Sequence, residues 1–209
     1  MKSGLNQGVT LIELLVTVSL IAIVLSLAAP SFRELMLNNQ RASHINAMMA
    51  SLNLARAEAI KRGTRTVVCI SDGAAPPDCA AAPKGWEEGW IVFIDDNVSG
   101  ASLNALDDPE DANDNKQWDR GEDALLDVHG PLAGGTTLRG NNSNVAKLIW
   151  FSRLSTSSWG TVTHCDSRGD GSARGIVISP SGRARLTSDS NGNGTEDNDG
   201  TPLVELTCP

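Results

Sequence analysis

The stretch Gly8-Val9-Thr10-Leu11-Ile12-Glu13-Leu14-Leu15-Val16 begins an apolar run that continues to Ala29 and meets Pro30. Val9 to Ala29 contains 21 residues. As a helix rising about 1.5 Å per residue, this run is roughly 32 Å long, which is enough to cross a hydrocarbon core of about 30 Å. The sequence therefore predicts one membrane-spanning helix near the N-terminus.

Glu13 is the only ionisable residue of that run. A carboxylate inside an apolar span is costly unless it finds a partner, so by default it marks a functional contact. If the chain were cut after Gly8, the new α-amino group of Val9 would lie about one helical turn from Glu13, on the same helix or on a neighbour. We expect that amine to be the partner.

Two alternatives are a cleaved secretory signal and a plain single-pass anchor. A secretory signal needs a small-residue cleavage site of the A-x-A type after its apolar core. Ala28-Ala29-Pro30 is a poor site because proline follows directly. The pattern favours a retained helix.

The leader resembles the class III leader of type IV pilins and pseudopilins. The resemblance lies in Gly8 followed by Val9-Thr10-Leu11-Ile12-Glu13-Leu14-Leu15, in Lys2 within a short polar leader, and in Pro30 closing the apolar run. It implies that a prepilin peptidase cuts between Gly8 and Val9 and methylates the new N-terminus, and that Glu13 pairs with the N-terminal amine of an adjacent subunit. The family usually has phenylalanine where this chain has Val9, so the product would be N-methylvaline.

The charge is unevenly distributed along the 209 residues, whose net charge is −8. Trp86 to Val128 contains 13 acidic and two basic residues, whereas Arg139 to Arg185 contains seven basic and two acidic residues. An acidic average argues against a protein that coats nucleic acid, but the two segments predict surfaces of opposite sign. The length after the apolar run suits one globular domain.

The four cysteines indicate disulfides: Cys69, Cys79, Cys165 and Cys208. They form no C-x-x-C pair and no zinc-type spacing. A basic leader would stay cytoplasmic, which places the domain on the oxidising periplasmic side. Three connectivities are possible. Proximity favours Cys69–Cys79, which leaves Cys165 for Cys208.

An amphipathic helix continues after Pro30. Its apolar residues recur at steps of three and four: Phe32, Leu35, Met36, Ile45, Met48, Met49, Leu52, Ala55 and Ala59. Lys61-Arg62 followed by Gly63 is typical of a helix end. The sequence predicts one helix from Val9 to about Arg62, with residues 9–29 in the membrane and 30–62 against the domain.

Short strands separated by turns follow this helix. We expect them at Thr64–Ser71, Trp90–Asp95, Ala124–Val128, Thr136–Leu138, Ala146–Phe151, Thr161–Thr163, Gly175–Ser179, Arg183–Thr187 and Leu203–Thr207. Ile178-Ser179-Pro180-Ser181-Gly182-Arg183 suits a hairpin turn. The predicted fold class is α+β, an N-terminal helix laid across antiparallel sheets.

This order resembles the GspH/FimT family of minor pilins and pseudopilins, through Trp86-x3-Trp90-Ile91-Val92-Phe93 and the run Gly175 to Arg183 near Cys208. The resemblance implies a type IV pilin-like fold with a cleaved leader at 1–8, a transmembrane helix at 9–29, its amphipathic continuation at 30–62 and a β-rich periplasmic domain at 63–209. The acidic stretch Asn104–Asp123 resembles an insertion.

A DNA-binding motif is suggested by Gly182-Arg183-Ala184-Arg185. Strand alternation would place Arg183 and Arg185 on one face, and guanidinium groups bind phosphates with fork geometry. In the DNA-uptake members of the family, which serve natural transformation, a GRxR motif contributes to binding. Further candidates for the basic face are Arg168, Arg174 and Arg153. Alternatively, Arg183 and Arg185 pair with the acidic residues Asp189, Glu196, Asp197 and Asp199, a contact of little energetic value.

A calcium loop is a weaker candidate. Asp189, Asn191 and Asn193, followed by Gly194, fit the opening D-x-N-x-N-G. The twelfth position is Gly200, where a bidentate glutamate is needed. An acidic turn without metal is therefore the favoured interpretation, and no other cofactor is predicted.

Catalytic motifs are missing from the sequence. His44, His129 and His164 are scattered, and neither a nucleophile elbow nor a phosphate-binding loop occurs. His164 beside Cys165 would suggest a nucleophile pair only if that cysteine were free. The chain is predicted not to be an enzyme.

These patterns together predict a structural subunit anchored in the inner membrane by one span and assembled with other pilins into a type IV pilus or a type II secretion pseudopilus. The resemblance names the prepilin peptidase as a processing partner and double-stranded DNA as a possible ligand. The alternatives are a secretion pseudopilin without DNA binding and a calcium-stabilised periplasmic domain. Pro30 and the Gly182–Arg185 motif favour the pilus.

Overall fold

The computed structural model describes residues 8–75, 77–81, 84–95, 118, 123–154, 156, 158–197 and 204–208. The chain forms two compact units, Met1–Asn39 and Gln40–Pro209. Helix α1 (Leu11–Arg62) belongs to both units.

The part of α1 in the first unit is apolar and exposed. Every described side chain from Gly8 to Met36 is exposed, and an 18-residue window of the helix has a mean hydropathy of 2.6. The hydroxyl groups of Thr17, Ser19 and Ser26 donate to carbonyls of the same helix. These three hydroxyl groups are satisfied within the helix, and the apolar segment is suited by length and composition to a bilayer.

Pro30 lies inside α1 and does not end it. The helix ends where the sequence predicts, at Arg62. Gly63 follows with a φ of +76°, and its N–H donates to the carbonyl of Ala59 at 2.9 Å. A positive φ suits glycine because it has no Cβ, so the chain turns here at low cost.

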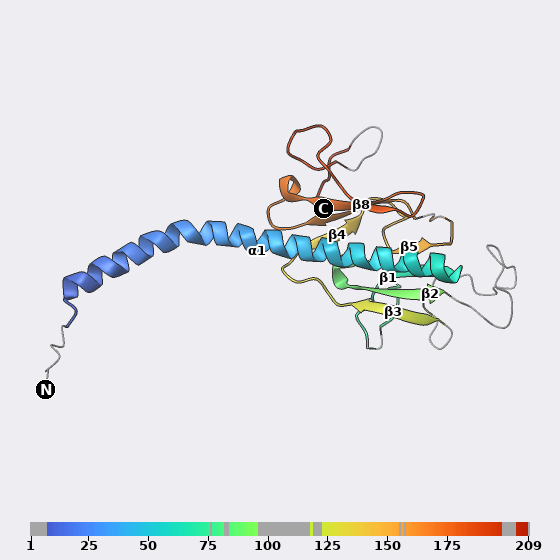
Figure 1. Ribbon diagram of the computed structural model, residues 1–209, viewed down its shortest axis with the longest axis horizontal. Helices are drawn as coiled ribbons and strands as arrows, with labels where there is room; N and C mark the ends of the chain where they lie inside the picture. The colour runs from blue at the N-terminus through green and yellow to red at the C-terminus, as the bar shows by residue number, and fades with distance from the viewer. Residues whose placement is uncertain are drawn as a thin grey trace. The chain divides into compact units, whose positions relative to one another are not determined.

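Two four-stranded antiparallel sheets follow in the second unit (Figure 1). The first has the order β3-β2-β1-β5, and the second has the order β4-β6-β7-β8. The strands of the first sheet are β1 (Arg65–Ile70), β2 (Trp90–Asp95), β3 (Ala124–His129) and β5 (Leu148–Phe151). Those of the second are β4 (Thr137–Gly140), β6 (Gly160–Cys165), β7 (Arg174–Ile178) and β8 (Ala184–Leu186). Short 3-10 helices occupy Trp86–Glu88 and Asp170–Ser172.

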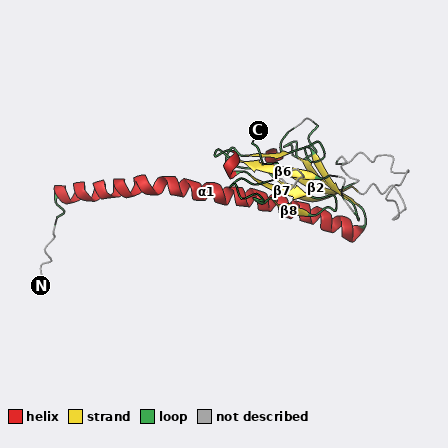
Figure 2. Ribbon diagram, turned by 90° about the horizontal axis from the view of Figure 1, so that it is seen from above, coloured by secondary structure: helices red, strands yellow, loops and turns green. Residues whose placement is uncertain are grey.

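The main core lies between α1 and the two sheets, and each sheet packs one of its faces against the helix (Figure 2). The helix contributes Ile45, Met48, Leu52, Ala55 and Ala59, all buried. The sheets contribute Val68, Ile70, Trp90, Val92, Ile149, Phe151, Leu138, Val162, Ile176 and Ile178. The predicted α+β class, with a helix packed on antiparallel sheets, is confirmed.

Two buried tryptophans of the core are anchored by hydrogen bonds. Trp90 Nε1 donates to Ser51 Oγ of α1 at 2.9 Å, and Trp86 Nε1 donates to the carbonyl of Val145 at 2.9 Å. Burying an indole leaves its N–H in need of an acceptor, and both are satisfied here.

The last predicted strand is wrong. Among the described residues of Leu203–Thr207, Glu205 alone forms a β-bridge, to Asp197. Leu206 N–H donates to the carbonyl of Glu196 at 2.9 Å. The described part of this segment therefore makes isolated backbone hydrogen bonds and does not pair as a strand. The acidic stretch Asn104–Asp123 lies outside the described residues except for Trp118 and Asp123.

The disulfides are Cys69–Cys79 and Cys165–Cys208, the pairing that proximity favours. The first links β1 to the connection that follows it. The second fastens the C-terminal segment to the end of β6, where Cys165, Ala173 and Leu206 form a small buried cluster. Cys208 N–H also donates to the Asp170 carboxylate at 2.7 Å.

Candidate functional site

The leader and Glu13 lie at the start of α1. Thr10 precedes the helix, and its hydroxyl accepts the N–H of Glu13 at 3.3 Å, as expected of a helix N-cap. Glu13 is in the first turn, where backbone N–H groups favour negative charge. Gly8, Val9 and Glu13 are exposed, so all three are accessible to a processing enzyme or a neighbouring helix.

The Gly182–Arg185 motif forms the predicted hairpin. Val177 pairs with Arg185, and Ile178 pairs with Ala184. The turn is closed by Gly182 N–H donating to Ser179 O at 2.8 Å and by Ser179 N–H donating to Arg183 O at 3.1 Å. Gly182 has a φ of +73°. Glycine thus serves the turn geometry.

Arg183 and Arg185 are both exposed on this hairpin. Ala184 between them packs against the main core, so Arg185 lies on the opposite face of β8. Arg183 lies in the turn beside Gly182. Two guanidinium groups are thereby presented to solvent within three residues.

Arg174 and Arg168 are placed elsewhere. Arg174 begins β7 and pairs in register with His164, at the end of the strand away from the Gly182 turn. Its Nε lies 3.1 Å from Glu196 Oε1, and Arg168 lies 2.6 Å from Asp166. The Arg168 guanidinium holds the pKa of Asp166 below its ordinary value. These two arginines are engaged in ion pairs and do not join the hairpin motif.

Two further arginines lie beside Gly182. Arg153 is a sequence-predicted candidate for the basic face, whereas Arg56 is not indicated by the sequence. A shallow recess of about 20 Å³ is lined by Arg56, Ile60, Phe151, Ser152, Arg153, Leu154, Ser181 and Gly182. A Cβ placed on Gly182 would lie 3.6 Å from Arg56 Nε and 3.3 Å from Phe151. Arg56 belongs to α1, so no sequence pattern near the motif indicates it.

The predicted calcium loop is ordered by its own hydrogen bonds. The Asp189 carboxylate accepts the N–H groups of Gly192, Asn193 and Gly194 at 2.7, 3.2 and 2.8 Å, and these bonds, with that of Gly194 foremost, lower the Asp189 pKa. Asn193 Nδ2 donates to Glu205 at 2.6 Å. In the described part of the chain, no three His, Cys, Asp or Glu residues gather as metal ligands. Calcium binding stays a prediction.

The histidines form no catalytic group among the described residues. His44 Nδ1 lies 3.1 Å from His164 Nε2, with the Thr136 hydroxyl at 3.5 Å from the same His44 nitrogen. His164 is fully buried, and burial lowers its pKa to about 4. His129 instead stacks on Trp90, with ring centroids 4.0 Å apart. Cys165 is in a disulfide, so it cannot serve His164 as a nucleophile.

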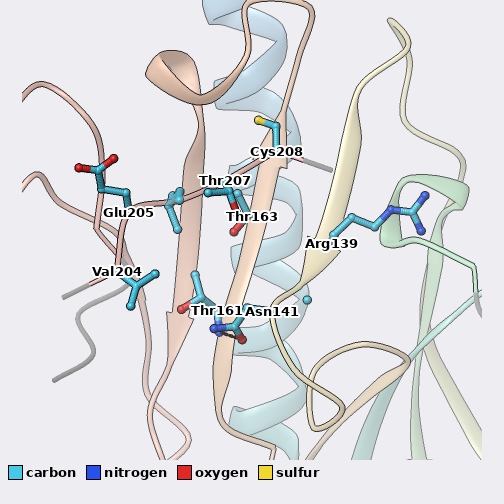
Figure 3. A pocket seen from close by; sticks show the side chains of 10 residues that line it. Arg139, Asn141, Thr161, Thr163, Val204, Glu205, Thr207 and Cys208 are labelled. Carbon is cyan, nitrogen blue, oxygen red and sulfur yellow. Dashed lines mark hydrogen bonds between the residues drawn. The ribbon is translucent and has the colours of Figure 1, made fainter. Parts of the chain in front are cut away.

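A pocket of about 380 Å³ lies between the second sheet and residues 204–208 (Figure 3). Thr161 and Thr163 of β6 form its floor, on the face of the sheet away from α1. Two of its polar side chains are already engaged: Arg139 with Glu87, and Asn141, whose Oδ1 accepts the N–H of Thr161. The pocket brings together none of the residues predicted for a site except Cys208.

Comparison with protein families gives two matches. The family described as Type II transport protein GspH matches residues 44–182. The prokaryotic N-terminal methylation motif matches residues 5–29. The chain belongs to the GspH family. It is thus a pilin-like or pseudopilin-like protein with the N-terminal motif of that class, and such proteins are structural subunits.

Among solved structures, the chain is similar to the type IV minor pilin FimU of Pseudomonas aeruginosa strain PAO1. One crystal form, in space group P21, is 18% identical with a TM-score of 0.48, and the match covers 74% of this chain and 92% of FimU. A second form, in space group P65, gives 16% identity and a TM-score of 0.45, covering 72% and 94%. No curated protein sequence matches the chain.

Proposed function

We propose that this GspH-family protein is a minor, non-enzymatic subunit of a type IV filament, either a pilus or a type II secretion pseudopilus. One observation carries the proposal: from Val9 to Ala29 the chain is exposed and apolar, with Glu13 in the first turn of α1 as its one charged residue. Such a surface is stable in lipid or packed against other helices. The second unit has a core of its own and would remain on the periplasmic side.

Glu13 gives the assembly its register. After cleavage between Gly8 and Val9, the α-amino group of Val9 becomes a cation at the start of the helix. In an apolar surrounding, Glu13 of one subunit is stabilised when it meets the Val9 amine of the next. The two helices then align in one defined stagger, and methylation of Val9 leaves this charge in place.

The test separates processing from assembly. In cells that contain the prepilin peptidase, Glu13→Ala should be cleaved like the wild type yet be strongly depleted from sheared filaments, as measured by immunoblot. Gly8→Val should block cleavage itself. Thr17→Ala is a matched control on the same helix that should be both cleaved and assembled.

Unchanged assembly of Glu13→Ala would overturn the register mechanism. The two machines are separated by deleting the gene and measuring piliation and secretion side by side. Loss of surface pili with normal secretion supports the pilus, and the opposite result supports the secretion pseudopilus.

Capture of double-stranded DNA for uptake is a second candidate function. The observation that favours it is the exposure of Arg183 and Arg185 on the β7–β8 hairpin. Binding would be directed at phosphates, so the affinity should fall steeply with salt.

The measurement is duplex binding by the full chain in phosphatidylcholine nanodiscs over a salt series. The Arg183→Ala/Arg185→Ala variant should lose most of the affinity and flatten the salt dependence. A wild-type protein that does not bind at low salt would refute DNA capture and leave the filament role standing.

A further inference from the structure

We propose that Arg56 and Arg153 are phosphate-binding residues that complete the Gly182 hairpin, so that the surface for duplex DNA spans α1, the segment after β5, and the β7–β8 turn. The inference rests on the proposed DNA capture and assigns to it two residues outside the sequence motif. It also excludes Arg168 and Arg174 from that surface.

Arg56 and Arg153 both line the recess at the Gly182 turn. Phe151 ends β5 and packs directly under Gly182, and Arg153 follows it by two residues. On the other side of the recess, α1 brings Arg56 to the same turn. Each neighbouring element therefore contributes one arginine to the lining of the recess at the hairpin turn, while Arg183 and Arg185 belong to the hairpin itself.

The surroundings of the recess carry an excess of positive charge. In the described part of the chain, no ion pair engages the side chains of Arg56, Arg153 or Arg183. The nearest acid along α1, Glu58, is held by Lys61 at 3.2 Å and Arg62 at 2.7 Å. Positive charge is thus concentrated here, on a protein whose net charge is −8. Such a local excess favours a polyanionic ligand.

The size and lining of the recess suit a phosphate group. The recess has room for about one water-sized group, which suits a phosphate oxygen and excludes a nucleobase. Phe151, the aromatic residue of the recess, is 1% exposed and cannot offer a ring face for stacking. A surface with arginines and no stacking platform contacts the duplex backbone and does not read its sequence.

The experiment compares salt slopes. Full-length wild type and Arg56→Gln/Arg153→Gln, both in phosphatidylcholine nanodiscs, are titrated with a fluorescent duplex at a series of salt concentrations. Each phosphate contact contributes about 0.9 to the slope of log K against log salt. We expect the variant to lower that slope by about 2, as Arg183→Ala/Arg185→Ala should also do.

The matched control is Lys84→Gln/Lys147→Gln, which removes the same charge. Lys147 precedes β5, and Lys84 binds the carbonyl of Asp72 beyond β1. Because β1 and β5 are antiparallel, both lysines lie at the ends of these strands away from Phe151. This variant should keep the wild-type slope, and tryptophan fluorescence should show that all variants are folded.

The outcomes are distinguishable. If Arg183→Ala/Arg185→Ala loses binding while Arg56→Gln/Arg153→Gln keeps the wild-type slope, the present inference fails and DNA capture stands. If the wild type does not bind duplex DNA, both fail. If Arg56→Gln/Arg153→Gln binds DNA normally but is depleted from filaments, the recess is a protein contact and the inference is overturned.

Discussion

Acidification should destabilise the second unit through one buried histidine. His164 is fully buried, and its Nδ1 has no hydrogen-bond partner among the described residues. The groups that act on it are His44 and Arg41 of α1 and Asp166 of the chain beyond β6. Burial is the main cause of its depressed pKa, and the neighbouring His44 adds to the effect. The unfolded chain binds a proton near pH 6.5, whereas the folded chain binds it only near pH 4.

The sign follows from linkage. The contribution of neutral His164 to stability is fully present above pH 6.5, decreases as the pH falls, and levels off below about 4, where both states are protonated. At about 1.4 kcal/mol per pH unit, this interval corresponds to a loss of roughly 3 kcal/mol in the free energy of unfolding. Asp166 titrates below its ordinary range, so it contributes little in this interval.

The assay is urea unfolding of the full chain in neutral detergent, followed by tryptophan fluorescence at pH 7, 6, 5 and 4. Trp86 and Trp90 are buried in the main core, so their emission should report unfolding of this unit. Burial also lowers the pKa of His44, but both proteins retain that residue, so the difference between the pH profiles of wild type and His164→Gln reports the loss of the His164 titration. Identical losses in wild type and His164→Gln would refute the reasoning.

Three further predictions concern stability, measured by the same unfolding assay. Cys208→Ser should cost about 4 kcal/mol, because the disulfide to Cys165 spans 43 residues; retention of wild-type stability on addition of reductant would contradict this. Gly182→Ala should cost roughly 1–2 kcal/mol, since alanine resists the φ of +73°, whereas Ser181→Ala should be neutral. Met48→Ala should cost about 2–5 kcal/mol because Met48 is fully buried, and Met48→Leu should cost under about 1.5 kcal/mol; equal effects of the two would exclude a cavity as the cause.

The local parts of the fold could be predicted from the sequence. The start of the apolar run at Val9 and the stop at Gly63 predict the limits of the helix, because both signals lie within a few residues of the observed bounds, Leu11 and Arg62. Strand β2 was predicted at its observed bounds, Trp90–Asp95, since it is a short apolar run that begins after a glycine. The strand predicted at Leu203–Thr207 is wrong because the described residues of this segment make isolated backbone contacts with Glu196 and Asp197.

The non-local parts could not be predicted. Strand β5 pairs with β1 and not with its neighbours in sequence, and that pairing brings Phe151 and Arg153 to the Gly182 turn. His44 and His164 meet across 120 residues for a similar reason. Residue spacing predicts which face a side chain takes, whereas only strand order decides which distant side chains share that face.

The disulfide between Cys165 and Cys208 also means that loss of the segment around Cys208 would change the chemical state of Cys165. A chain truncated before Cys208 would keep a free thiol on Cys165. It would also lack the segment that lies over Thr161 and Thr163 of β6. An intact, oxidised subunit has no free thiol. Thiol chemistry could therefore distinguish finished subunits from truncated ones before they enter a filament, since a thiol-reactive reagent would label only the latter.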